Sequence, residues 1–490
     1  MTLLDDARSV AESALRLYAG SPEEAELADL RRRLEEPLRV AIAGRVKAGK
    51  STLLNALVGE RLAPTDAGEC TRIVTWFRDG HTYRVDVHPV DGPARQARFS
   101  RDDGALDIDL AGLPLEQIER IDVTWPSQEL RRATLIDTPG IGSLTDHVSR
   151  RTWELLAVDD DEAPADAVLY LMKHLHVDDM EFLRAFHDTE VSRPNPVNAI
   201  GVLSRADEIG VGKLDSMASA RRICTRLTRD PRVRRVVQTV VPLAGLLAET
   251  AATVTQEEFA HLSKVAELAP AEVEDLLVSA DRFLVERPEL RLTDLEREAL
   301  LTRFGVFGLR LASVMIRQGV TTTATSLAQE LTRRSGLEGL HDVLRTLFFD
   351  RRDVLKSRSA LLAVDSLLRR RPPRGDGSGL AAQVEQILAS AHPFNELRVL
   401  SAIRAGWVPG KPDVLTGLEQ VLGGAGNDAR TRLGLEVDAD GNAMKVAAVE
   451  ALERWQRRAE SPMTPHPLAV AARVAVRTCE GILTRPESGS

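Results

Sequence analysis

Short, uniformly apolar runs alternate with amphipathic helical patterns in the first half of the chain. Residues 38–43 form one such run, and further runs follow at 133–136, 167–172, 199–203 and 239–243. Continuous apolar runs of this length are typical of strands buried on both faces of a parallel sheet. Because helical patterns separate several of them, we predict a doubly wound α/β domain with a mostly parallel sheet. Residues 78–125 differ, and their alternating runs predict extra inserted strands.

Helical periodicity dominates the rest of the chain. A helix is expected over 3–18, and a second one is expected to begin with Ser21 as its N-cap and to end before Pro37. From about residue 255 onward nearly every segment has a helical pattern. The stripe over 337–371 predicts one helix about 50 Å long, at roughly 1.5 Å per residue. Later helices are expected at 380–392, 395–405, 413–423, 444–459 and 466–483.

Composition limits the class of protein. With 490 residues, 43% of them hydrophobic, the chain is globular and long enough for more than one domain. The net charge of -9 argues against a polycation that binds nucleic acid. The three cysteines are far apart in sequence and favour a reducing cytoplasm over a disulfide framework. Two arginines interrupt the longest apolar stretch, at 304–320, so we expect at most a peripheral membrane association.

The apolar run at 38–43 leads into a glycine-rich loop of the pattern G-x-x-x-x-G-K-S. The loop is Gly44-Arg45-Val46-Lys47-Ala48-Gly49-Lys50-Ser51, and Thr52 follows it. Backbone N–H groups and the start of the next helix wrap phosphates in such a loop. Lys50 is expected to neutralise the β- and γ-phosphates, and Ser51 to bind Mg²⁺ through its hydroxyl. We therefore predict nucleotide contacts along the whole stretch 44–52.

A second loop, Asp137-Thr138-Pro139-Gly140, follows the run at 133–136. Asp137 is expected to hold Mg²⁺ through a water molecule, and Gly140 to offer its N–H to a γ-phosphate. Between the two loops, Thr71 is a candidate that binds Mg²⁺ and positions the attacking water. Thr65 competes for this role, and a local turn bond is the alternative role for Thr71.

The candidate for base recognition is Ser204-Arg205-Ala206-Asp207, directly after the run at 199–203. The carboxylate of Asp207 can accept hydrogen bonds from N1–H and N2–H₂ of guanine, which adenine lacks, so the motif favours GTP over ATP. Ser204 and Arg205 stand where the usual motif has Asn or Thr and then Lys, and the guanidinium of Arg205 can cover the base. The alternative is an Asp207 that caps a surface helix. Residues 243–245, which follow a predicted strand, are a weaker candidate for a further part of the guanine site.

Together these residues resemble the bacterial dynamin-like GTPases. The resemblance rests on the stretch 40–65, with L-N-A-L-V-G after the glycine loop, and on G-E-C-T-R, I-D-T-P-G and S-R-A-D. It is most marked for the actinobacterial isoniazid-inducible type, through P-T-D-A, T-R-I-V-T-W-F-R and R-F-G-V-F-G-L-R, and it extends over nearly the whole chain. Streptomycete dynamin-like proteins of sporulation septation are a related possibility.

The resemblance implies a GTPase domain over 37–350 with a helical extension from about 255. It also implies N-terminal neck helices over 1–36 and a C-terminal helical neck or trunk over 351–490. GTP and GDP are the implied ligands, with Mg²⁺ as cofactor. The implied partners are a second copy through the GTPase domains, or a dynamin-like paralogue, and the implied place is the cytoplasm, at the inner membrane face.

One departure from the family lies inside the glycine loop. Many eukaryotic dynamins have Gln and then Ser where this chain has Val46 and Lys47. Val46 cannot hydrogen-bond water through its side chain, so slow basal hydrolysis is expected. Lys47 can supply positive charge to the reaction, which makes it a catalytic candidate beside Lys50 and Thr71. The alternative is an ordinary solvated lysine.

Two segments are candidates for contact with anionic lipid. Residues 351–374 carry eight Lys or Arg and two Asp, a net charge of +6. The proposed contacts there are Arg369, Arg370, Arg371 and Arg374. The alternative for that segment is a solvated helix end, where arginine also favours the helix dipole. The rival segment is 405–410, with Trp407 either as an interfacial anchor or as a packed loop side chain.

Three function classes compete. The first is a GTPase that couples hydrolysis to assembly and membrane remodelling, which the large helical fraction favours. The second is a regulatory switch or scaffold that hydrolyses GTP poorly and recruits division or envelope proteins. The third, a P-loop kinase, lacks a recognisable acceptor site and is disfavoured by S-R-A-D.

Overall fold

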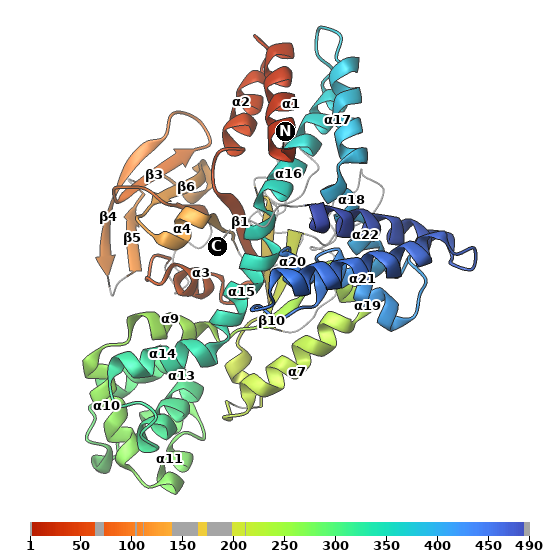
Figure 1. The fold of residues 1–490 in the computed structure, drawn as a ribbon. Helices are drawn as coiled ribbons and strands as arrows, with labels where there is room; N and C mark the ends of the chain where they lie inside the picture. The colour runs from red at the N-terminus through yellow and green to blue at the C-terminus, as the bar shows by residue number, and fades with distance from the viewer. Residues whose placement is uncertain are drawn as a thin grey trace.

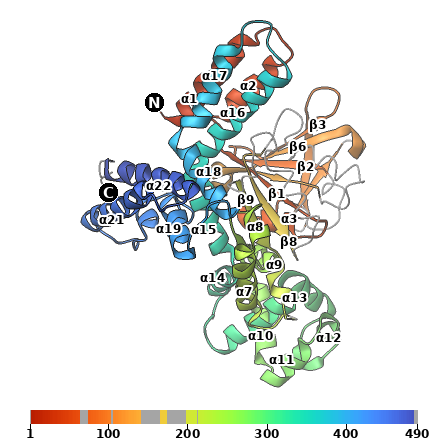
Figure 2. The same ribbon diagram turned by 90° about the vertical axis from the view of Figure 1, so that its right-hand side faces the viewer.

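The computed structural model describes residues 2–63, 73–102, 105–110, 112–139, 165–173, 198–210 and 212–484. The described part contains a ten-stranded sheet in the order β10-β9-β8-β1-β7-β2-β6-β3-β4-β5, with helical regions extending away from it (Figures 1 and 2). The strands are β1 (Leu38–Gly44), β2 (Val74–Arg78), β3 (Arg84–Pro89), β4 (Arg95–Asp102), β5 (Ala105–Asp109), β6 (Ile118–Thr124), β7 (Ala133–Asp137), β8 (Ala167–Met172), β9 (Ala199–Leu203) and β10 (Val240–Pro242).

Strands β10, β9, β8, β1 and β7 are mutually parallel and contain all five of the predicted apolar runs. Every residue of β1 is buried, and Val40 lies opposite Leu135 of β7 and Ala167 of β8. Burial on both faces explains why these strands read as continuous apolar runs. The predicted parallel α/β core is confirmed, and the loop after β1 emerges at the middle of its carboxyl edge.

The extra strands expected within 78–125 are also confirmed. Strand β2 runs antiparallel to β7 and parallel to β6, and β3, β4 and β5 continue the sheet in antiparallel pairs. Trp76 of β2 is covered by the guanidinium groups of Arg39 and Arg78, at 4.9 and 4.8 Å from its ring centre. Because the inserted strands include antiparallel pairs, the whole sheet is mixed, while the half that carries the glycine loop is parallel.

Helices flank the sheet and then form a separate helical lobe, seen at the lower left of Figure 1. The flanking helices are α3 (Lys50–Val58), α4 (Gln128–Arg132), α7 (Ser216–Arg229), α8 (Pro231–Arg234) and α9 (Gly245–Thr253). The lobe comprises α10 (Gln256–Glu267), α11 (Pro270–Leu276), α12 (Ala280–Leu284), α13 (Asp294–Arg317) and α14 (Ala324–Ser335). Its apolar side chains belong to the same core as one face of the sheet.

Helix α13 is long and apolar enough to cross a membrane by composition, with a mean hydropathy of 1.5 over its most apolar window. Half of that window is buried inside the molecule. Leu300, Phe304 and Met315 lie in the core of the lobe, and Gly305 interrupts the helical backbone at φ 59°. These contacts are those of a core helix. A buried core helix can meet the same criterion of length and hydropathy as a helix that crosses a membrane.

The single helix predicted over 337–371 is wrong. The structure has α15 (Leu337–Leu347), a 3-10 turn at Phe349–Arg351 and α16 (Arg352–Arg370). Leu344 and Phe348 pack in the core of the sheet, whereas Leu361 and Val364 pack in a different core. Because the two halves of the stripe bury against different partners, the chain turns between them.

That second core belongs to a bundle of four helices that are far apart in sequence. Helices α1 (Leu3–Leu17) and α2 (Glu24–Arg33) lie beside α16 and α17 (Ser378–Ser390) in both ribbon views. The hydroxyl of Thr2 caps α1 in a reciprocal bond with Asp5. The predicted Ser21 cap is wrong, because Ser21 closes a turn with Glu24 and α2 begins without a side-chain cap.

The last helices form a third body with its own core. They are α18 (His392–Arg404), α19 (Pro412–Val421), α20 (Ala429–Leu433), α21 (Gly441–Glu460) and α22 (His466–Thr484). Four of them confirm predicted helices, and the short α20 was not predicted. Leu400, Leu418 and Trp455 lie in this core. An ion pair of 2.5 Å between Arg234 of α8 and Glu419 of α19 joins this body to the sheet domain.

Candidate functional site

The glycine loop connects the central strand β1 to α3. A Cβ on Gly44, where φ is 150°, would lie 2.5 Å from the carbonyl oxygen of Leu171, so only glycine fits there. Gly49 has a left-handed backbone, with φ 92°, immediately before Lys50 begins the helix. The two glycines thus turn the backbone so that the N-terminus of α3 faces the loop, which is the arrangement that binds phosphate.

Lys50 lies folded over this loop. Its side chain is almost buried, and Nζ donates to the carbonyl oxygens of Gly44 and Arg45 at 3.3 and 3.2 Å. Burial lowers the pKa of Lys50, while the nearby carboxylate of Asp137 opposes that shift. A phosphate group in the loop would give the ammonium a stronger, charged acceptor.

Ser51 and Asp137, which were both predicted to serve Mg²⁺, are brought together. The Ser51 hydroxyl donates to one Asp137 oxygen at 3.0 Å, and the other oxygen, Oδ1, is buried without a hydrogen-bond partner in the described structure. Burial raises the pKa of Asp137 to about 6, against the opposing effects of Lys50 and Ser51. A hydroxyl beside an incompletely satisfied carboxylate fits a hard cation such as Mg²⁺.

Thr138 fixes the end of β7 against β1. Its backbone N–H and its hydroxyl both bond the carbonyl oxygen of Ile42, at 3.3 and 3.0 Å. This anchors the start of the second loop beside the glycine loop. The predicted roles of Thr71, Thr65 and Gly140 fall on residues outside the described part of the chain.

The base-recognition motif lies against the glycine loop. Arg205 has a left-handed backbone, with φ 52°, and its Nη2 donates to the carbonyl oxygen of Lys47 at 3.1 Å. Its Nη1 bonds Glu208 at 2.9 Å, and Lys173 bonds the same carboxylate at 2.6 Å. Lys173 and Glu208 were not predicted from the sequence, although each directly follows a predicted element.

Asp207 occupies the 3-10 turn Ala206–Glu208 that follows β9. Burial raises its pKa, and the neighbouring Glu208 adds to that shift. Ser204, before the turn, is buried, and its hydroxyl has no partner within the described residues. The motif therefore holds at least one buried polar group, the Ser204 hydroxyl, without a partner in the part of the chain that the structure describes.

The weaker element at 243–245 lies directly beside this motif. The N–H of Ala206 donates to the carbonyl oxygen of Leu243 at 3.1 Å. A Cβ on Gly245 would lie 3.6 Å from the methyl group of Thr52, the residue after the glycine loop. Tertiary structure thus gathers three segments that extend over about two hundred residues of the sequence.

The interior of the glycine loop is open to solvent. Val46 is 58% exposed, and Lys47 is exposed with a left-handed backbone, φ 61°. A residue other than glycine in this conformation costs roughly 1 kcal/mol. The catalytic role predicted for Lys47 stays a prediction, because the structure shows only where its backbone lies.

The basic segment at 351–374 is less exposed than its composition indicates. Arg351 and Lys356 are buried, and Nζ of Lys356 bonds the carbonyl oxygen of Leu34 at 2.7 Å. The predicted lipid contacts sit at the far end of α16 and in the turn after it, where Arg369 pairs with Asp365 at 2.8 Å. The rival Trp407, between α18 and α19, is 38% exposed.

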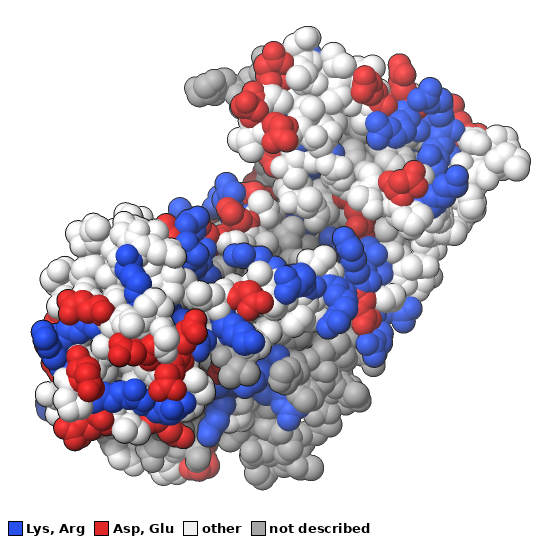
Figure 3. Space-filling model, turned by 90° about the horizontal axis from the view of Figure 1, so that it is seen from below, with Lys and Arg blue, Asp and Glu red and all other residues white. Residues whose placement is uncertain are grey.

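A denser basic surface, which the sequence reading missed, lies on α7 and α8. Lys and Arg side chains form a band across the middle of the face seen in Figure 3. Within residues 216–235 the only acidic residue is Asp230. The exposed arginines of this segment are Arg221, Arg222, Arg226, Arg229, Arg232 and Arg235. Their helical spacing was the signal that could have revealed the surface.

Comparisons with known proteins fit this site. Residues 40–205 match the model of the Dynamin family. The chain is 38% identical to the isoniazid-induced protein IniC of Mycobacterium tuberculosis (strain ATCC 25618 / H37Rv), over 99% of both chains. It is 28% identical to the isoniazid-induced protein IniA of the same strain, over 62% of this chain and 42% of IniA. A solved structure of an oligomerised bacterial dynamin pair aligns with 99% of this chain and 75% of that one. The TM-score of this match is 0.31 and the identity is 12%, which is too weak a similarity to support a conclusion.

Proposed function

This chain belongs to the bacterial dynamin-like proteins of the IniC type, and we propose that it hydrolyses GTP with Mg²⁺ to drive assembly and membrane remodelling. The family expected from the motifs is confirmed by 38% identity over 99% of the chain. A GTPase domain of the dynamin family occupies residues 40–205. Within the site, the observation that carries the proposal is the 3.0 Å contact of Ser51 with Asp137, whose second oxygen lacks a partner.

The phosphates bind where Lys50 now contacts backbone carbonyl groups. Nζ leaves the oxygens of Gly44 and Arg45, to which it is bonded at 3.3 and 3.2 Å, for the β- and γ-phosphates. The N–H groups of the loop and the first turn of α3 complete the cradle. Ser51 and Asp137 hold Mg²⁺, Asp137 through water, and the ion neutralises charge on the phosphates when bound. Thr71 is proposed as a further ligand.

The guanine base binds against Asp207, whose carboxylate accepts from N1–H and N2–H₂. Arg205 covers the base from its position beside the loop. The contacts of Arg205 with Lys47 and Glu208 leave the guanidinium in a defined place, which supports this role. Residues 243–245 close the other side of the base pocket.

Basal hydrolysis is proposed to be slow. Val46 is apolar and exposed, so at this position the loop offers no side chain that can orient water. Assembly then completes the site, through a second copy of the GTPase domain or through a dynamin-like paralogue. The similarity to IniA, at 28% identity over 322 residues, supports a paralogue of that type as the partner.

We place the protein in the cytoplasm, at the inner membrane face. The candidate lipid contacts are Arg369, Arg370, Arg371 and Arg374 at the end of the four-helix bundle, or Trp407. Tyr18 bonds the carbonyl oxygen of Arg371 at 2.7 Å, so the turn that carries the arginines is held at the end of this bundle. An anionic leaflet attracts each nearby base by about 1 kcal/mol.

The second candidate function is a GTP-binding scaffold that hydrolyses poorly and pairs with a paralogue or with division proteins. The exposed apolar Val46 favours it, because its side chain cannot orient the attacking water. The two candidates share every nucleotide contact. They differ only in whether assembly or a membrane stimulates turnover.

GTP turnover by the purified full-length protein separates the two candidates. It is measured alone, with anionic liposomes, with an IniA-type paralogue and with both, and Lys50→Ala serves as the inactive control. We expect at least about tenfold stimulation in one of these mixtures, since completing a site of this kind is worth three or more orders of magnitude in related switches. GTP binding without stimulation in any mixture supports the scaffold, and absence of GTP binding contradicts both candidates.

A further inference from the structure

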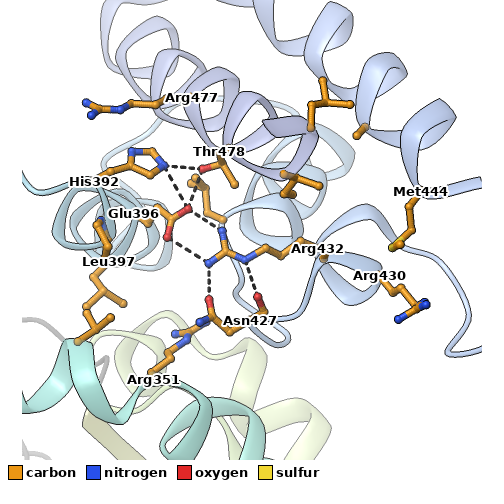
Figure 4. Close-up of a pocket in the computed structure, with 18 of the residues that line it drawn as sticks. Arg351, His392, Glu396, Leu397, Asn427, Arg430, Arg432, Met444, Arg477 and Thr478 are labelled. Carbon is orange, nitrogen blue, oxygen red and sulfur yellow. Dashed lines mark hydrogen bonds and ion pairs between the residues drawn. The ribbon is translucent and has the colours of Figure 1, made fainter. Parts of the chain in front are cut away.

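A cavity of about 660 Å³ lies where the C-terminal helices meet the turn after α15, and none of the glycine-loop residues lines it (Figure 4). It is lined by the turn at Arg351, the start of α16, and helices α18, α20, α21 and α22. Cavities of about 300–1,000 Å³ are typical of sites for small molecules. Neither the family resemblance nor the GTPase motifs assign a role to this place.

The polar side of the cavity carries far more positive than negative charge. Its basic residues are Arg351, Arg430, Arg432, Lys445 and Arg477, and among the described residues that line it Glu396 is the only carboxylate. Figure 4 shows Arg432 and Glu396 bonded at the centre, with His392 and Thr478 above them and Arg351 below them beside Asn427. The excess of basic over acidic side chains along this lining makes the cavity suited to an anion.

Glu396 is also fully engaged by the protein. It accepts two bonds from Arg432, at 2.6 and 3.1 Å, and one from the hydroxyl of Thr478 at 2.7 Å. The imidazole of His392 lies 3.3 Å from the same carboxylate. Although burial opposes the shift, the bonds from His392 and Arg432 lower the pKa of Glu396 to about 2. Its single negative charge is therefore shared mainly between Arg432 and His392, and it also acts on Arg351.

Arg351 is a buried base whose guanidinium is only partly hydrogen-bonded. It is only 3% exposed, Nη2 donates to the carbonyl oxygen of Gly423, and Nη1 has no hydrogen-bond partner within the described structure. Burial and the nearby Arg404 and Arg432 lower the pKa of Arg351 to about 10, against the opposing effects of Glu396 and Asp350. A buried N–H without an acceptor is unfavourable, and an anion in the cavity would supply one.

The backbone at Gly423 lets two guanidinium groups approach the same point. A Cβ on Gly423, where φ is 84°, would lie 3.0 Å from Nη2 of Arg351 and 3.2 Å from Nη2 of Arg432. Because Glu396 and Asn427 already hold Arg432, Nη1 of Arg351 is the donor that stays open to a phosphate oxygen. The arrangement is built by three separate segments, and it is not a chance row of surface lysines.

Apolar side chains also line the cavity. They are Leu397, Leu422, Met444, Ile482 and Leu483. In Figure 4, Met444 projects from α21 on the side away from His392 and Arg477. A small inorganic anion leaves this surface without a partner, whereas a ligand with a hydrocarbon part covers it.

We propose that this cavity binds a phosphate-bearing amphiphile, with its phosphate at Arg351 and its hydrocarbon part against Met444 and the other apolar side chains that line it. The ligand bridges the segment that leaves the sheet domain and the C-terminal helices. Because Arg351 sits in the turn between α15 and α16, an occupied cavity ties these two bodies together. The site is independent of GTP, so its occupancy is measurable in the nucleotide-free protein.

The proposal is tested by calorimetric titration of the full-length, nucleotide-free protein. The probes are inorganic phosphate and lysophosphatidic acid kept below its critical micelle concentration, with a monoacylglycerol of the same chain length as the uncharged control. We expect the acyl phosphate to bind at least about tenfold more tightly than inorganic phosphate, because both sides of the cavity then contribute. Equal affinity for the two phosphates removes the apolar half of the proposal, and binding of neither phosphate overturns it.

Variants locate the binding. Arg477→Gln and Lys445→Gln each remove one charge at the cavity and are expected to weaken the acyl phosphate about threefold to tenfold. The matched control is Arg473→Gln, which removes an exposed charge one turn earlier on α22 but does not line the cavity. Met444→Trp fills the apolar side and should weaken the acyl phosphate while leaving inorganic phosphate unchanged. Equal effects in the control and the cavity variants contradict the site, and thermal unfolding confirms that each variant is folded.

Discussion

Arg205 donates a hydrogen bond from Nη2 to the backbone carbonyl oxygen of Lys47, at 3.1 Å. The bond joins the base-recognition motif to the phosphate loop, and both residues have left-handed backbones, with φ 52° and 61°. Two positions of unfavourable backbone geometry thus face each other across the site. Strain of this kind is typically concentrated at functional sites, where the surrounding structure maintains it.

Replacing Arg205 by Lys should weaken GTP binding about fivefold with little change in kcat. The charge is kept, but a single ammonium cannot bond both the Lys47 carbonyl and Glu208 as the guanidinium fork does, and one such bond is worth about 1 kcal/mol. Binding of a fluorescent GTP analogue measures the change. An unaltered affinity contradicts a role for this bridge in shaping the site.

Asp207→Asn should reduce GTP affinity by about a hundredfold, since an amide cannot accept from both N1–H and N2–H₂ of guanine and loses two charge-assisted bonds. The same change should raise affinity for xanthosine triphosphate, whose 2-oxo group accepts from the amide. Competition binding with the two nucleotides measures the switch. Glu208→Gln is the matched control on the neighbouring residue and should not change base preference; a preference that Asp207→Asn leaves unchanged favours the capping role.

Asp137→Asn should abolish Mg²⁺-dependent turnover and yet stabilise the nucleotide-free, metal-free protein at pH 8. The pKa of Asp137 is raised from 3.8 to about 6 by burial, so the folded chain binds this proton more tightly than the unfolded chain. The stability from protonation is complete below the ordinary pKa and is lost as the pH rises through about 6. Ionisation then costs the folded state about 2–3 kcal/mol at pH 8.

Thermal unfolding in EDTA at pH 8 and at pH 5 measures that effect. The variant should unfold at a higher temperature than the wild type at pH 8, and the difference should shrink at pH 5, where Asp137 is largely protonated. If the wild type is more stable than the variant at pH 8, the ionised Asp137 does not destabilise the folded protein. That result contradicts its assignment as an electrostatically strained cation ligand. The apparent affinity for Mg²⁺ should fall as the pH drops from 8 to 5, because protonation of Asp137 removes the charge that binds the ion.

Lys47→Ala tests whether the loop lysine contributes charge to the reaction. Alanine keeps the Cβ, and therefore the backbone strain at φ 61°, so the change removes only the charged side chain. A catalytic role predicts a loss of about tenfold or more in kcat, with GTP affinity nearly unchanged. Turnover and affinity that both stay at the wild-type level would leave Lys47 as a solvated residue.

Changing Arg369, Arg370 and Arg371 together to Gln should reduce binding to anionic liposomes about a hundredfold, at roughly 1 kcal/mol for each base. Trp407→Ser tests the rival contact in the same co-sedimentation assay. The control removes three exposed arginines from α7, at Arg221, Arg222 and Arg226. Loss of binding in that control alone would move the contact to the basic surface of α7 and α8, and wild-type binding in all three would exclude every one of these surfaces.

Local signals were sufficient for much of the fold. Strands buried on both faces produce continuous apolar runs, so β1, β7, β8, β9 and β10 were predictable from the pattern alone. The glycine loop was equally readable, because Gly44 and Gly49 have backbone conformations or close contacts that other residues do not tolerate. The helices after residue 255 followed from their periodicity for the same local reason.

The failures arose where distant segments decide the outcome. The stripe over 337–371 is one continuous helical pattern, but its two halves pack in different cores, and only the folded chain shows where one core ends. Net charge over 351–374 also misled, because Arg351 and Lys356 are buried by segments far away in sequence.

The sequence by itself determined the nucleotide loop, the apolar runs that form the parallel strands, and the family. Each of these depends on residues that are neighbours in the chain. Only the tertiary structure decided that Arg205 meets Lys47, that Ser51 meets Asp137 and that Arg351 and Arg432 converge at Gly423. Each of these contacts joins segments separated by tens to more than a hundred residues. The physical reason is that burial and charge pairing act through space, and a linear pattern carries no record of which distant segment will be the partner.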